Sequence, residues 1–192
     1  MNDNMSLHLR ALDRFGEAVA AADGQWERPS PCEGWDARAV VEHVIGFHDV
    51  LILRPLDAVP ERPKGETRRR WEATDAALRR VLATHSFDEP IEVPAIGKNP
   101  ATTIDGSRLL PMLSQDVLIH AWDLARAVGG NDRLDEALCE RFLARMPDDE
   151  NALQASGMFG APIIVPPESD AQARLLGRVG RNPEWEAGSA TD

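Results

Sequence analysis

The stretch from Leu109 to Val128 constrains the fold most, because helical spacing puts ionisable side chains on an apolar face. At about 3.6 residues per turn, one broad stripe collects Leu109, Leu113, Val117, Leu124 and Ala127. Asp116, His120 and Asp123 fall on that stripe or at its edge. A buried carboxylate without a partner is strongly destabilising. The sequence therefore predicts a partner for these side chains.

Two kinds of partner fit this helix. Asp116 and His120 are spaced i, i+4, so both side chains project from one face and could hold a single divalent cation. Alternatively, His120 bonds a neighbouring carbonyl, and the two aspartates pair with arginines such as Arg38 or Arg126. The helix alone leaves both interpretations open.

Length and composition indicate a single globular domain. The chain has 192 residues, of which 43% are hydrophobic and 28% charged. We expect one domain over 1–185 and a disordered tail over 186–192. No apolar run approaches the length of a membrane span, and residues 1–9 lack the pattern of a secretory signal, so we expect a cytoplasmic protein.

Charge and cysteine content exclude two further classes. A net charge of -11 argues against a nucleic-acid partner, which needs a concentrated basic surface. The basic run 68–70 has acidic neighbours and predicts a solvated helix face. Cys32 and Cys139 lie far apart, which excludes a disulfide framework and fits a reducing compartment. Cys32 as a reactive thiol is less favoured than Cys32 as a small, partly buried residue.

Hydrophobic periodicity predicts an all-α protein. Helices are expected over 5–22, 37–53, 67–84, 107–128 and 134–146, with a short helix over 150–158 and a final one over 169–179. Asp36 is a plausible N-cap, and Ser169 with Gln172 forms a capping box. Segments 91–93 and 102–104 alternate around a turn at 97–100 and predict a short hairpin. The four long helices predict an antiparallel bundle decorated by C-terminal elements.

The second predicted helix adds an imidazole to the pattern. His43 lies beside the apolar stripe of 37–53, so two histidines and one carboxylate from two helices, with Asp116 and His120, could face one another. Such donors suit Zn, Ni or Fe, and three protein ligands leave positions open for water or substrate. The alternative is that His43 is an ordinary core histidine. His48 falls on the flank of this helix, and His8, near a helix end, is a weaker candidate.

The sequence also resembles a known superfamily. The segments that carry the resemblance are Pro31-Cys32-Glu33-Gly34-Trp35-Asp36 with His43, residues 116–127, residues 159–162 and 175–178, and Asn182-Pro183-Glu184-Trp185. Together they are similar to the DinB-like superfamily. Within it, they most resemble uncharacterised metal-binding proteins similar to the N-terminal domain of mycothiol-dependent maleylpyruvate isomerase.

The resemblance implies a four-helix bundle that holds a divalent ion, usually zinc or nickel. It assigns the ligand roles to His43, Asp116 and His120, and Asp123 would orient one of these ligands. The isomerase pattern has Glu at the position of Asp116. Because Asp is one methylene shorter, the resemblance leaves open weaker, water-mediated or displaced binding.

The resemblance further implies a thiol-dependent transferase or isomerase, in which the metal activates a low-molecular-weight thiol such as mycothiol toward a small electrophile. Arg38 or Arg126 would then hold a carboxylate of the thiol or substrate. Two alternatives remain: a metal-dependent binding or sensing module without turnover, and a structural bundle with no metal, for which a homodimer is one expected form. The absence of an evident second domain disfavours the isomerase's own reaction.

Overall fold

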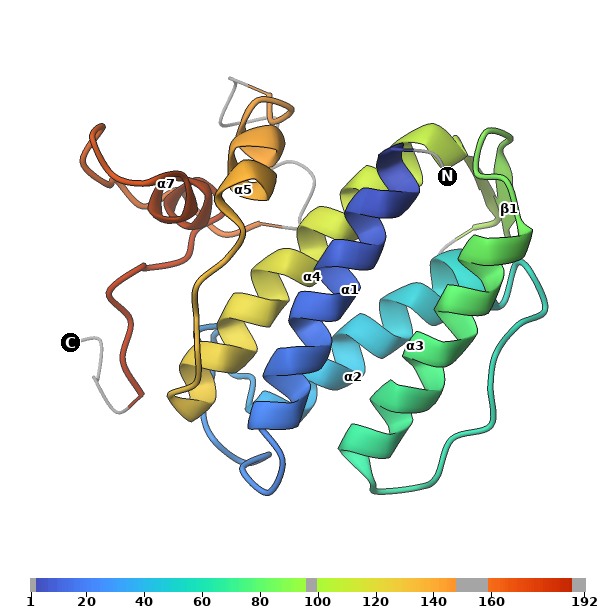
Figure 1. Ribbon diagram of the computed structural model, residues 1–192, viewed down its shortest axis with the longest axis horizontal. Helices are drawn as coiled ribbons and strands as arrows, with labels where there is room; N and C mark the ends of the chain where they lie inside the picture. The colour runs from blue at the N-terminus through green and yellow to red at the C-terminus, as the bar shows by residue number, and fades with distance from the viewer. Residues whose placement is uncertain (1–2, 96–99, 148–158, 188–192) are drawn as a thin grey trace.

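Four long helices form a bundle in the computed structural model, which describes residues 3–95, 100–147 and 159–187. They are α1 (Asp3–Ala21), α2 (Ala37–His48), α3 (Thr67–Thr84) and α4 (Gly106–Val128). Figure 1 shows α1 lying alongside α4, with α2 and α3 completing the bundle. The all-α prediction and the helical bundle are confirmed.

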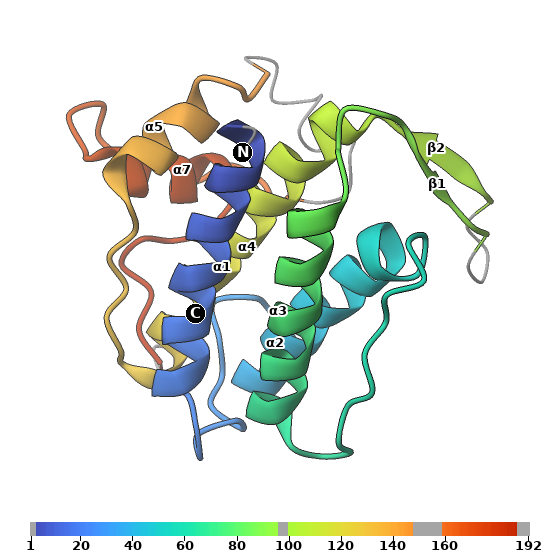
Figure 2. The ribbon, with the colours of Figure 1, turned by 45° about the vertical axis from the view of Figure 1, so that its right-hand side comes forward.

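Two helices of the bundle run in each direction (Figures 1 and 2). The starts of α1 and α4 meet where Asn4 donates to the Ser107 carbonyl, and their ends meet where Gly130, just beyond α4, lies beside Ala21. α2 and α3 run the opposite way, because the irregular segment 54–66 returns the chain before α3 begins. The parallel pair α1 and α4 therefore packs antiparallel to the parallel pair α2 and α3.

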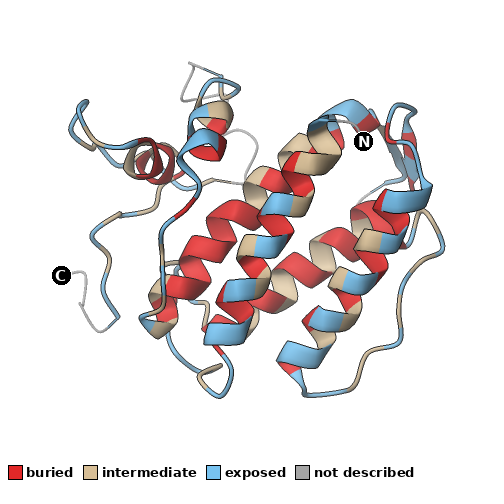
Figure 3. Ribbon diagram, viewed as in Figure 1, coloured by how far each residue is buried: buried red, intermediate tan, exposed pale blue. Residues whose placement is uncertain are grey.

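Helix α4 forms the centre of the molecule, and Figure 3 shows it buried over most of its length. Its apolar stripe is inaccessible, as the sequence predicts. Asp105 caps the N-terminus by accepting a hydrogen bond from the Ser107 amide, and Gly129 ends the helix in the left-handed conformation. The polar residues of α4 therefore lie inside the bundle.

Helix α2 does not continue as a regular α-helix to residue 53. After His48 the chain widens into a π-helix, η1 (Asp49–Leu53), and Arg54 donates to the carbonyl of Asp49. The predicted hairpin is present as β1 (Ile91–Val93) and β2 (Thr102–Ile104), which pair antiparallel with Ile91 opposite Ile104. Most of its predicted turn lies outside the described residues.

Two short helices, α5 (Glu136–Leu143) and α7 (Ala171–Arg178), pack against each other beside the bundle. The capping box predicted from Ser169 is wrong, because Asp170 is the N-cap and accepts from the Ala173 amide. Gln172 instead bonds the backbone of Leu134 and of Asp132. The helix predicted over 150–158 and the tail over 188–192 lie outside the described residues.

Within the part of the chain that the structure describes, no helix combines the length and the apolar character needed to cross a membrane.

Candidate metal centre

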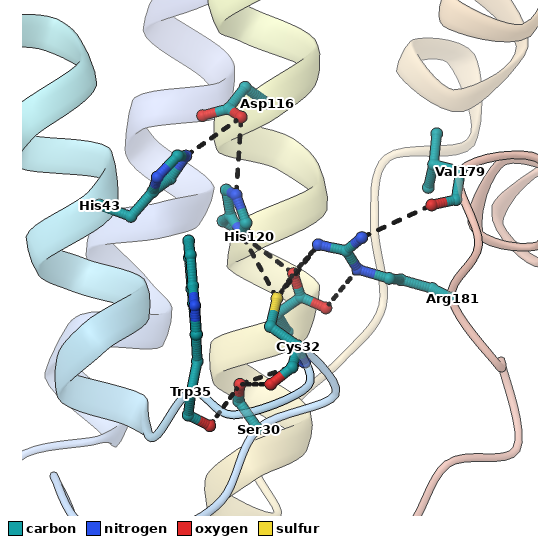
Figure 4. Close-up of polar contacts among 9 residues, drawn as sticks. Ser30, Cys32, Trp35, His43, Asp116, His120, Val179 and Arg181 are labelled. Carbon is teal, nitrogen blue, oxygen red and sulfur yellow. Dashed lines mark hydrogen bonds and ion pairs between the residues drawn. The ribbon is translucent and has the colours of Figure 1, made fainter. Parts of the chain in front are cut away.

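Three side chains from two helices converge on one point inside the bundle. His43 comes from α2, and Asp116 and His120 come from successive turns of α4. Asp116 Oδ1 lies 3.5 Å from His43 Nε2 and 3.5 Å from His120 Nε2. Figure 4 shows both imidazoles turned toward this carboxylate. The structure thus brings together the three ligands that the sequence suggests.

The local sequence explains how His43 reaches this point. The Asp36 side chain accepts a hydrogen bond from the Ala39 amide, so α2 starts at Ala37 as predicted. Val40 and Val44, which flank His43, are fully buried and fix the side of α2 that faces α4. His43 lies at the edge of this buried face, where 32% of its side chain remains accessible.

The donor atoms fit a divalent cation. One ligand atom from each of the three residues lies within 4.8 Å of the others. His43 Nε2 and Asp116 Oδ2 are buried and make no hydrogen bond within the described residues. Buried polar atoms normally have partners, and a cation between these donors would supply one. Two imidazole nitrogens and one carboxylate are a donor set that Zn, Ni and Fe accept.

Without a cation, protons balance the charges of this cluster. Burial by itself raises the pKa of Asp116, but the hydrogen bonds and charges of His120 and His43 lower it below its usual range. Burial alone lowers the pKa of His120, but Asp116 and then Asp123 raise it well above its usual value. A proton on His120 Nε2 therefore occupies the place that a cation would take.

Asp123 holds His120 from the opposite side. Its Oδ2 accepts a hydrogen bond from His120 Nδ1 at 2.9 Å, so a neutral His120 would present the lone pair of Nε2 to Asp116. Asp123 has no exposed surface, and Arg181 donates to both of its carboxylate oxygens, at 3.2 and 3.0 Å. Burial opposes ionisation, but His120 and Arg181 lower the pKa of Asp123.

Cys32 lies next to this buried pair. Its Sγ is 3.1 Å from Asp123 Oδ2, 3.1 Å from Arg181 Nη2 and 4.0 Å from His120 Nδ1. Burial raises the pKa of the thiol, so Cys32 is a neutral hydrogen-bond donor here. The sequence favours Cys32 as a small packing residue, but in the structure its thiol also makes polar contacts with Asp123 and Arg181.

A compact loop holds Cys32 in place. The Ser30 amide donates to the Trp35 carbonyl, and the Trp35 amide donates to the Cys32 carbonyl. Ser30 Oγ also accepts from the Cys32 amide at 3.2 Å. Gly34 has a φ of 75°, a backbone conformation that suits glycine at this turn. The loop between α1 and α2 is therefore ordered by its own hydrogen bonds.

Cys32, His120 and Asp123 form a second group whose ligand atoms lie within 4.8 Å of one another. The guanidinium of Arg181 already contacts two members of this group. The positive charge of this guanidinium lies beside the atoms that would bind a cation, and it would repel that cation. Of the two groups, that of His43, Asp116 and His120 is therefore the better candidate for a metal site.

A pocket of about 420 Å³ opens onto the metal donors. It is lined by Cys32, Glu33, Trp35, His43, Phe47, Asp116, His120 and Arg181. The Trp35 ring lies 4.9 Å from the His43 ring and 5.9 Å from the His120 ring, and Phe47 stacks on His43 at 5.5 Å. These aromatic side chains hold both imidazoles and form the apolar wall of the pocket.

The two arginines suggested for substrate binding lie elsewhere. Arg38 bonds Glu27 and Thr67, and Arg126 lines a separate pocket of about 300 Å³. Neither lines the pocket at the metal donors. Arg181, which the sequence reasoning did not single out, is the arginine that reaches this pocket. Its contact with Asp123 joins residues 58 positions apart, so no local pattern predicts it.

Comparison with known proteins supplies the family. The description of the matching family model is mycothiol maleylpyruvate isomerase N-terminal domain, and the match covers residues 8–125. The chain belongs to this family. As a member of the mycothiol maleylpyruvate isomerase N-terminal domain family, it has His43, Asp116 and His120 within the matched residues, whereas Arg181 lies beyond them.

Two related sequences are uncharacterised proteins from two strains of Mycobacterium tuberculosis. Each is 33% identical to this chain over 147 residues, which cover 74% of this chain and 76% of the relative. No solved structure matches the chain at a significant score.

Proposed function

We propose that this protein binds a divalent metal through His43, Asp116 and His120 and transfers a low-molecular-weight thiol of the mycothiol type to a small electrophile. The observation that supports the metal is the pair of buried atoms His43 Nε2 and Asp116 Oδ2, which make no hydrogen bond within the described residues and lie beside a third donor, His120. The family description, which names mycothiol, supports the thiol.

When bound, a divalent cation would lower the pKa of a ligated thiol and so supply a thiolate nucleophile at neutral pH. Asp123 would keep the proton of His120 on Nδ1 and leave Nε2 available. His120 and Arg181 lower the pKa of Asp123, and an ionised Asp123 would accept the hydrogen bond that orients His120.

The pocket is shaped for a substrate with an apolar part. The Trp35 ring packs against both imidazoles and the Phe47 ring stacks on His43, so one wall of the pocket is apolar. At about 420 Å³ the pocket has the size of ordinary small-molecule sites.

Elemental analysis of protein purified without an affinity tag tests the metal. We expect about one equivalent of zinc or nickel in the wild-type protein, and strong loss of it in His43→Ala, Asp116→Asn and His120→Ala. Arg38→Ala is the control, because Arg38 does not line the pocket and should leave the metal content unchanged.

The metal-loaded protein is then incubated with mycothiol and small electrophiles, and thiol consumption is followed. Consumption that requires both metal and His120 supports the transferase. Bound metal without thiol-dependent turnover would instead indicate a binding or sensing module. A wild-type protein that takes up neither zinc nor nickel on reconstitution would contradict the metal function.

A further inference from the structure

A further pocket, of about 290 Å³, lies between the first half of α4 and the end of α5. We call it the α4–α5 groove. It shares no lining residue with the pocket at the metal donors. Its lining residues are Ser107, Arg108, Pro111, Met112 and Gln115 of α4, Phe142 of α5, and Arg145, which follows α5.

The charge of the α4–α5 groove is opposite to that of the whole chain. The chain has a net charge of -11, yet the lining of the groove includes Arg108 and Arg145 and no acidic residue. Two guanidinium groups at one groove repel each other, and no other lining residue neutralises them. An anion in the groove would therefore be attracted by both.

Neither of these arginines has a partner within the described residues. Most arginines in this part of the chain form an ion pair with a carboxylate, as Arg62 does with Asp49. The side chains of Arg108 and Arg145 form no ion pair and no hydrogen bond there. Their donor groups are therefore available to a ligand.

Two aspartates near the groove are engaged elsewhere. Asp105, at the start of α4, accepts hydrogen bonds from the amide and the hydroxyl of Ser107. Asp3, at the start of α1, forms its ion pair with Arg141. Neither carboxylate forms an ion pair with a groove arginine, so the positive charge of the groove remains.

A third donor in the lining also lacks an acceptor. Gln115 lines the groove, and its Nε2 is buried and makes no hydrogen bond within the described residues. Buried polar groups normally have a partner. Since the guanidinium groups and this amide nitrogen are all donors, the group that would satisfy them is a negatively charged acceptor.

The other part of the lining is apolar and indicates an organic ligand. Pro111, Met112 and Phe142 contribute carbon surface to the groove. An inorganic ion would leave this surface in contact with water, whereas an alkyl or aryl group would cover it. Guanidinium groups match the oxygens of both carboxylates and phosphates.

We propose that the α4–α5 groove binds a small organic anion. Its carboxylate or phosphate head group contacts Arg108, Arg145 and Gln115, and its apolar part lies on the carbon surface of the groove. The site is separate from the metal donors, so the proposal does not rest on the function proposed above.

Titration of the metal-free, full-length protein, followed by nuclear magnetic resonance, tests the site. The probes are hexanoate and hexyl phosphate, which carry the two head groups, and hexanol, which has the same alkyl chain without charge. We expect saturable shifts of the Gln115 side-chain amide signals with the anions. Hexanol should bind at least about tenfold more weakly, because it cannot form charge-assisted hydrogen bonds. The tighter of the two anions identifies the head group.

Substitution of each arginine tests the contacts. Arg108→Gln and Arg145→Gln should each weaken binding of the tighter anion by about tenfold and leave hexanol binding unchanged. The control is Arg54→Gln. Arg54 is exposed and forms no ion pair within the described residues, but it does not line the groove, so this variant should keep wild-type affinity.

Three results would overturn the proposal. The first is the absence of saturable shifts at Gln115 with both anions, and the second is wild-type affinity in both groove variants. The third is equal weakening in Arg54→Gln, which would show attraction to positive charge in general. Because the protein is metal-free, none of these results bears on the metal function, and His120→Ala should bind the anion as wild type does.

Discussion

Asp123 is a fully buried carboxylate that accepts hydrogen bonds from His120 and Arg181. Removing one member of a buried ion pair leaves the other charge without compensation. We expect Arg181→Met to lower the free energy of unfolding by about 3 kcal/mol, since Asp123 would stay buried without its cation. Urea denaturation of the metal-free protein measures this change.

The double variant Arg181→Met, Asp123→Asn is the control for that measurement. It removes both charges, so it should lose clearly less stability than the sum of the two single variants. Additive losses would show that the guanidinium and the carboxylate do not stabilise each other.

At the level of single residues, the sequence predicts Asp116 and His120 better than the residues that contact them from distant segments. The i, i+4 spacing of Asp116 and His120 on an apolar stripe already indicates a shared site, because both residues belong to one helix. Arg181 and Cys32 come from segments separated by 149 positions, and they meet only in the folded chain. Helical periodicity carries no information about such a contact.

Two helical glycines show how packing changes the effect of the same substitution. A Cβ on Gly46 of α2 would meet no atom within 4 Å, whereas a Cβ on Gly106 would lie 2.4 Å from the Phe87 carbonyl oxygen. We expect Gly46→Ala to stabilise the protein by about 0.5–1 kcal/mol through helix propensity. Gly106→Ala should destabilise it by about 1–3 kcal/mol through steric overlap.

Thermal unfolding of both glycine variants checks this prediction. A raised midpoint for Gly46→Ala beside a lowered midpoint for Gly106→Ala is the expected pattern. Equal shifts in the same direction would mean that propensity alone decides, and that the start of α4 does not pack tightly against the chain before β1.

Elements with strong local patterns are predicted well. The predicted bounds of α3 and of both hairpin strands are the bounds that the structure has. The end of α2 is different, because a π-helix has no periodicity that distinguishes it from an α-helix over five residues. At α7, Ser169 and Asp170 are both good caps, and the tertiary contacts of Gln172 select Asp170.

For the whole molecule, the buried histidines predict a dependence of stability on pH. The pKa values of His8 and His48 are lowered in the folded state, so the unfolded chain binds more protons below about pH 6.5. Stability should therefore fall as the pH is lowered from 6.5 to 5, by at most about 1.4 kcal/mol per pH unit for each histidine.

His120 does not act in this window. Its pKa is raised, so its contribution is fully present below about pH 6.5 and is lost only as the pH rises. Urea denaturation at pH 5 and 6.5, with a chelator present, should give a smaller slope for His48→Gln than for wild type. An unchanged slope in His48→Gln would contradict the assignment.

The contact between Arg181 and Asp123 also has a consequence for the order of events during protein synthesis. The ribosome releases the metal donors of α2 and α4 well before it releases Arg181, which the chain reaches 58 residues after Asp123. Until then Asp123 has no guanidinium beside it, and His120 has an uncompensated carboxylate behind it. The nascent chain can thus form its bundle early, but the support for His120 is completed only when the C-terminal segment docks.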